Sequence, residues 1–163
     1  MKQFMQKIVV LFAMVSLQSF ADVQIRDGYV REMPPGQQNT AAFMHVLNSG
    51  DKPVVIVRAE SSRAASVELH QHIHANGMMR MQAVPSITIP AKGEFVFKSG
   101  DYHVMLLGVT PAVKAGETVV LVFVMDDGAR IAVDLPVKPI TAAKPAAAAD
   151  SAHSEHAGHH GHH

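Results

Sequence analysis

The chain has 163 residues, a length that suits a single domain, and it contains 14 basic and 14 acidic residues, 11 histidines, 10 methionines and no cysteine. The absence of cysteine excludes disulfides and any thiolate, whether catalytic or metal-binding. The balanced charge provides no basic field that would attract nucleic acid or a membrane surface.

Residues 1–21 have the layout of a secretory signal peptide. Lys2 and Lys7 precede the apolar run "IVVLFAMV", and the small residues Ser19 and Ala21 predict cleavage after Ala21. The apolar run is shorter than the roughly 20 residues that span a membrane. A lipoprotein anchor would need a cysteine at the cleavage site, and the sequence has none. We therefore expect a soluble chain exported to a bacterial periplasm, with 12 basic and 14 acidic residues after loss of two lysines, a net charge of −2.

From residue 22 to about residue 138 the sequence consists of short apolar segments separated by glycine, proline and asparagine. No segment keeps the 3.6-residue period of a helix, and many short strands with turn residues between them predict an all-β sandwich or small barrel. The expected strands are residues 23–32, 40–48, 54–60, 66–74, 78–84, 87–90, 94–97, 103–109, 118–125 and 130–137.

Histidine and methionine share faces of these strands. Residues two apart in a strand lie roughly 6.8 Å from each other on the same face, so His103 and Met105 in "HVMLL" point the same way. In "VELHQHIH" the same rule places Glu68 and three histidines on one face, and after the turn "ANG" it pairs Met79 with Met81. The three histidines of that segment are His70, His72 and His74.

Imidazole and thioether donors without a thiolate form a soft ligand set, which favours Cu(I), whereas a blue-copper electron-transfer centre needs a cysteine. A methionine in a β-sheet protein is more often a packing residue, and a single histidine is more often structural than a ligand. Spacing alone therefore leaves both the metal site and ordinary packing open, and His45 is expected to be structural. His72 and His74 are either solvated or additional ligands.

Residues 22–138 resemble the PCuAC family of periplasmic copper chaperones. The resemblance is carried by "VELH", "GMMRMQAV", "ITIPAKGEFVFKSGDYHVMLLGV" and "LVFVMDDG", and by "MPPG" and "TAAF" nearer the N-terminus. The family often has methionine where this chain has Gln71, and glycine where it has Asp101. We call residues 22–138 the body of the chain. The resemblance implies four Cu(I) ligands in the body, at the family's spacing, and these are His70, Met81, His103 and Met105.

The resemblance also implies a cupredoxin-like Greek-key fold that binds Cu(I) near its surface. It implies delivery of copper to a periplasmic or membrane-attached cuproenzyme, such as the CuA centre of a respiratory oxidase, often alongside a Sco-type thiol chaperone. A copper nitrite reductase is an equally reasonable acceptor. Because the sequence has no heptad pattern or large apolar stripe, we expect a monomer.

Residues 139–163 change in composition to a Pro/Ala linker followed by a histidine-rich tail. The tail has no apolar residue larger than alanine, so we expect it to be disordered without metal. Imidazole suits Cu(II), which leads the divalent ions in affinity, although an expression tag is the alternative explanation. The candidate Cu(II) ligands are His153, His156, His159, His160, His162 and His163.

The sequence contains no Ser-His-Asp or Cys-His pattern and no phosphate-binding glycine loop, so we expect a protein that is not an enzyme. The first hypothesis is a copper chaperone. A periplasmic copper buffer, storage or resistance protein without a dedicated acceptor is the alternative, and a copper enzyme is the third possibility. Transfer of the metal to an apo partner separates the first two, and turnover tests the third.

Overall fold

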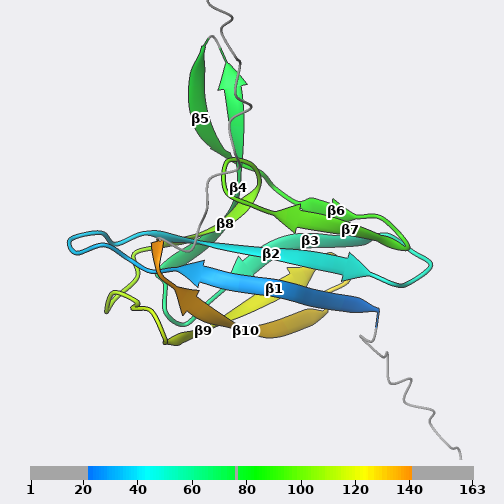
Figure 1. Ribbon diagram of the computed structural model, residues 1–163. Coiled ribbons are helices and arrows are strands. Elements are labelled where there is room, and N and C mark those ends of the chain that lie inside the picture. The colour runs from blue at the N-terminus through cyan, green and yellow to red at the C-terminus, as the bar shows by residue number, and fades with distance from the viewer. Residues whose placement is uncertain (1–21, 76, 141–163) are drawn as a thin grey trace, which may run out of the picture.

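The structure, a computed structural model, describes residues 22–75 and 77–140 (Figure 1). The expected signal peptide and residues 141–163 of the expected linker and tail lie outside these residues. In the described ranges there is no helix with the length and hydrophobicity of a membrane span.

All ten expected strands are present, and their boundaries differ from the expected ones by at most two residues. Their short length follows from the glycine, proline and asparagine turns that separate them. They are β1 (Val23–Arg31), β2 (Thr40–Asn48), β3 (Val54–Glu60), β4 (Ser66–Ala75), β5 (Met78–Ala83), β6 (Ile87–Ile89), β7 (Gly93–Phe97), β8 (His103–Leu107), β9 (Thr118–Met125) and β10 (Arg130–Lys138).

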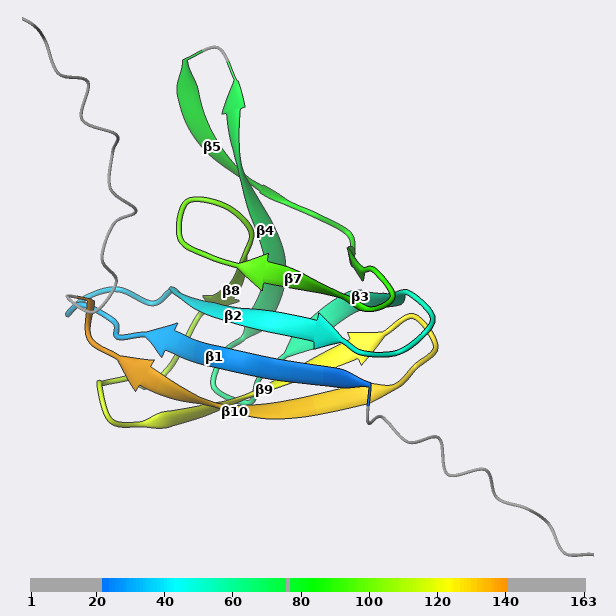
Figure 2. The same ribbon diagram turned by 45° about the vertical axis from the view of Figure 1, so that its right-hand side comes forward.

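The strands form two groups that pack against each other (Figures 1 and 2). One group has the order β5-β4-β8-β2-β1, with β7 also paired to β2, and the other has the order β10-β9-β3-β6. A short parallel pairing of Val30 and Arg31 with Val137 and Lys138 joins the two groups. The path from β5 to β6 does not close among the described strands, so the arrangement is an open all-β sandwich.

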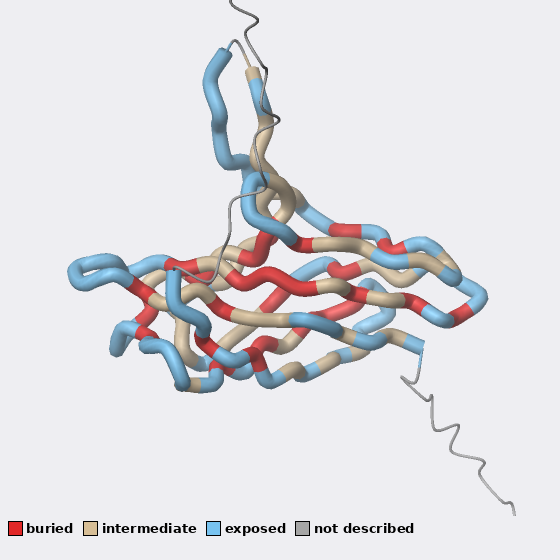
Figure 3. Tube along the Cα trace, in the orientation of Figure 1, coloured by how far each residue is buried: buried red, intermediate tan, exposed pale blue. Residues whose placement is uncertain are grey.

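The core lies between the two groups, where buried positions recur along the central strands (Figure 3). The rings of Phe97 on β7 and Phe123 on β9 stack with centroids 6.2 Å apart and tie one group to the other. On β8, Val104 and Leu106 are completely buried. Each such side chain contributes about 1.5–3 kcal/mol to stability, and their burial fixes which face β8 turns toward the core.

Strand β4 belongs partly to the body and partly to a projecting hairpin. Its residues from Ser66 to His70 pair with β8, and its residues from His70 to Ala75 pair with β5. The β4–β5 hairpin therefore extends away from the sandwich (Figures 1 and 2), and β5 is exposed along its whole length. His70 lies at the point where β4 leaves the body.

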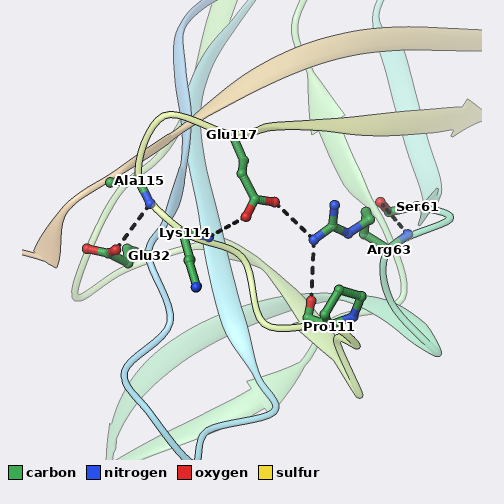
Figure 4. Close-up of polar contacts among 7 residues, drawn as sticks. All are labelled: Glu32, Ser61, Arg63, Pro111, Lys114, Ala115 and Glu117. Carbon is green, nitrogen blue, oxygen red and sulfur yellow. Dashed lines mark hydrogen bonds and ion pairs between the residues drawn. The ribbon is translucent and has the colours of Figure 1, made fainter.

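The loop between β8 and β9 is held by side-chain contacts from two other segments (Figure 4). Arg63 donates from Nη2 to the Glu117 carboxylate at 3.1 Å and to the carbonyl oxygen of Pro111 at 3.3 Å. On the other side of the loop, the backbone N–H of Ala115 donates to the Glu32 carboxylate at 3.1 Å. Contacts of this kind, at or near the surface, add little stability, but they fix the loop against the end of β1.

Candidate metal centre

The register of β4 against β8 brings together the two histidines of the expected body site. His70 and His103 are directly opposite partners, with ring centroids 5.8 Å apart. Met105 is opposite Glu68 in the same pairing. Opposite residues of an antiparallel pair project to the same face, so His70, His103 and Met105 share one face of the sheet.

The register of β4 against β5 brings the remaining expected residue to this face. Met81 is directly opposite His72, two residues beyond His70. His72 also lies diagonally across from His103, and the two ring centroids are 5.0 Å apart. The sequence places His72 about 7 Å along the strand from His70, yet its ring is the nearer of the two to His103.

A cavity of about 340 Å³ lies on this face. Met81, His103 and Met105 line it together with His72, and Arg31 and Phe43 contribute to its wall. Glu32 and Ile140, the last described residue, also lie on its boundary. His70 is not among the lining residues, so three of the four expected body residues border the cavity and the fourth adjoins it.

The exposure of the methionines bears on whether they are packing residues. Met44 is 1% exposed and is a core residue, whereas Met81 is 54% exposed and lies outside the core. Met105 is half-buried at the cavity wall. Packing in the core therefore does not explain Met81, and both thioether groups border space that an ion can enter.

His103 is buried and its ring is oriented by the backbone. Its Nδ1 lies 3.0 Å from the carbonyl oxygen of Asp101. Because a carbonyl oxygen only accepts hydrogen bonds, Nδ1 carries the proton, and the lone pair of Nε2 is left for a metal. Burial lowers the pKa of His103 below its usual value, against the opposing effect of the Asp101 hydrogen bond, and this favours the neutral ring that binds metal.

The lowered pKa of His103 predicts acid sensitivity of the metal-free protein. Because the pKa is lower in the folded than in the unfolded state, the stabilisation is present above the unfolded value of about 6.5 and is lost as the pH falls through the folded value. We expect the urea concentration at the unfolding midpoint to decrease as the pH is lowered from 7 to 5. The decrease should be smaller in the His103→Gln variant. Equal decreases in the two proteins would contradict this prediction.

His70 and Glu68 form a pair beside the cavity. His70 Nε2 lies 2.7 Å from Glu68 Oε2, and the side chains are 15% and 43% exposed. The Nδ1 atoms of His70 and His72 are both buried, without a hydrogen-bond partner in the described structure. Each of these two rings therefore has one nitrogen that makes no hydrogen bond within the described structure. Leaving a buried nitrogen without a partner costs free energy, and a bound metal would satisfy it.

Carboxylates and imidazoles do not by themselves form a metal site here. Within the described residues there is no group of three or more histidine, aspartate or glutamate side chains arranged to hold a metal ion. A metal at this cavity would therefore depend on the thioethers of Met81 and Met105 as well as on imidazole. That mixed set suits a soft ion, as the sequence predicts.

Some neighbours of the cavity are not apparent from the sequence. The Arg31 guanidinium lies 5.0 Å from the centre of the Phe43 ring, and this ring lies 6.4 Å from the ring of His103. These residues come from β1 and β2, and only their pairing through the sheet brings them to the site. No local sequence pattern around residues 31 or 43 indicates that they lie beside the site. All six expected tail ligands lie outside the described residues.

Comparison with known proteins identifies the family. The family model for LpqE-like proteins, described as "Putative lipoprotein LpqE-like", matches residues 23–137. The chain belongs to the LpqE-like family. A protein of similar sequence is "Putative lipoprotein Lxx21020" of Leifsonia xyli subsp. xyli, which is 34% identical to this LpqE-like chain over 122 residues. The alignment covers 74% of this chain and 72% of the relative.

Solved structures resemble the LpqE-like chain along most of its described length. The Cu(I) form of DR1885 from Deinococcus radiodurans is 34% identical with a TM-score of 0.60, over 76% of this chain and 83% of that one. The copper-bound PCuAC domain from PmoF2 is 19% identical with a TM-score of 0.60, over 72% and 93% of the two chains, and shows the shared fold alone. The expected all-β, cupredoxin-like fold is confirmed.

Proposed function

We propose that this protein is a periplasmic copper chaperone that binds Cu(I) in the cavity beside β4, β5 and β8. The observation that carries the proposal is the meeting of thioether and imidazole groups at one accessible cavity, in a chain that has no cysteine. Soft donors without a thiolate favour Cu(I) over harder divalent ions. The 34% identity to DR1885, whose structure was solved with Cu(I), supports the same metal.

The proposed body ligands are His70, Met81, His103 and Met105. The neutral Nε2 of His103 provides one imidazole donor, oriented by the hydrogen bond from Nδ1 to Asp101. The Glu68 carboxylate beside His70 can orient the second imidazole in the same way. The exposure of Met81 gives an incoming protein access to the metal from the hairpin side.

The proposed organisation has three parts: a signal peptide at residues 1–21, the copper-binding domain at residues 22–138, and a linker and tail at residues 139–163. The tail histidines would bind Cu(II). The proposed acceptor is a cuproenzyme with a CuA centre or a copper nitrite reductase. A Sco-type thiol chaperone is proposed as a second partner, and the protein itself is proposed to act as a monomer.

The proposed function is tested by binding and transfer. Purified protein is titrated with Cu(I) in competition with a chromophoric Cu(I) chelator, and the loaded protein is then mixed with an apo CuA domain. We expect one Cu(I) held in the body and its appearance in the CuA domain, read from the visible absorption of that centre. Failure to compete with the chelator overturns the metal assignment, and tight binding without transfer favours the buffer alternative.

A further inference from the structure

His72 has the contacts expected of a metal ligand, although the resemblance assigns the neighbouring His70. It lines the cavity together with Met81, His103 and Met105. It is the direct cross-strand partner of Met81, and its ring centroid is 5.0 Å from that of His103. Its buried Nδ1 has no hydrogen-bond partner within the described structure, so no protein hydrogen bond there competes with a metal for this atom.

His70 is held differently. Its Nε2 is engaged by the Glu68 carboxylate at 2.7 Å, and its side chain does not line the cavity. Its ring lies 5.8 Å from that of His103, compared with 5.0 Å for His72. To reach a metal at the cavity, His70 must use its unpartnered Nδ1 or release Glu68.

We infer that His72 is a copper ligand of this site and that His70 and His72 exchange as the imidazole that joins His103. The inference rests on the proposed function. The site then has five donors from three strands, four lining the cavity and His70 adjoining it, which is more than a tetrahedral site needs. A spare imidazole on β4 lets one donor leave and return while the metal stays bound.

This arrangement suits a protein that must release its metal to a partner. When an incoming donor from the acceptor displaces one imidazole, the other can remain with His103 and the thioethers. His74, the next residue on the same face of β4, is exposed and is paired with Met79 farther out on the hairpin. It does not line the cavity, and therefore serves as a matched control.

The test compares four variants of the full-length protein by Cu(I) competition: His70→Asn, His72→Asn, the double variant of the two, and His74→Asn. The tail is identical in all of them, so differences report the body site. If the two rings exchange, adding His72→Asn to the His70→Asn variant should lower the Cu(I) affinity at least about tenfold, because neither of the two exchanging imidazoles then remains. His74→Asn should change the affinity by less than about twofold.

The inference is overturned if the double variant binds Cu(I) as tightly as His70→Asn alone. A second measurement covers the case in which a variant misfolds. In the wild-type protein, Cu(I) should shift the ring nitrogen resonances of His72 in nitrogen-15 NMR spectra, and unchanged His72 resonances with bound Cu(I) would also overturn it. If wild-type protein fails to bind Cu(I) at all, it is the proposed function that fails.

Discussion

Replacing both Met81 and Met105 by alanine is expected to remove sulfur from the copper site and to lower the Cu(I) affinity by about 100-fold or more, beyond what loss of an outer-sphere contact costs. Thioethers supply the soft half of the donor set, and imidazole alone holds Cu(I) less well. The measurement is competition with a Cu(I) chelator, together with X-ray absorption at the copper K-edge, which reports sulfur neighbours directly.

The fold is expected to survive this change. Met81 is 54% exposed on the edge strand β5, and Met105 is only partly buried, so the loss of stability should be smaller than the about 2–5 kcal/mol of a fully buried methionine. The matched control is the double change of Met78 and Met79 to alanine. These residues are 52% and 58% exposed on the same strand but do not line the cavity.

The two double variants together decide the assignment. The control should bind Cu(I) like wild type, because it removes two thioethers from the hairpin that carries Met81 but none from the cavity. If M81A/M105A keeps wild-type affinity while its circular dichroism is unchanged, the thioethers of the cavity are not ligands. If the control loses as much affinity as M81A/M105A, the hairpin as a whole binds the metal, and the cavity is not the site.

The sequence predicts the strands well because the information for them is local. Turn residues such as those in "SGDKP", "ANG" and "DDG" end each apolar segment, and the expected and observed strands 40–48, 54–60 and 118–125 coincide. Side-chain alternation is equally local. It correctly places His103 and Met105 on the face opposite Val104 and Leu106, whose burial fixes the orientation of β8.

Cross-strand register could not be predicted in the same way, because it depends on pairing between residues far apart in the chain. Alternation in "VELHQHIH" puts His70 and His72 on one face without saying which is nearer to His103. That is decided by β4, which pairs with β8 up to His70 and with β5 from His70 onward. The hydrogen bond between His70 and Glu68, and the approach of the Phe43 ring to the His103 ring, are further consequences of side-chain packing.

Deleting the residues after Lys144 is expected to abolish most Cu(II) binding and to leave Cu(I) binding by the body unchanged. The deleted segment contains six histidines and no sulfur, whereas the cavity is lined by two thioethers. Imidazole must be neutral to bind a metal, and its unperturbed pKa is about 6.5. Cu(II) affinity of the full chain should therefore fall steeply between about pH 7.5 and pH 5.5, as protons compete for several imidazoles.

The position of the last described residue gives this experiment a second purpose. Ile140 borders the cavity, so the described part of the chain ends at the edge of the body site. If the proposed linker of about 12 residues behaves as a random coil, its reach is roughly 20 Å, which would allow the tail to return to the cavity. The full-length M81A/M105A variant is the matched control, because it should keep Cu(II) binding while losing Cu(I). Cu(II) binding that survives tail deletion, or that is flat across this pH range, would assign the divalent ion to the body and leave the tail as a spacer.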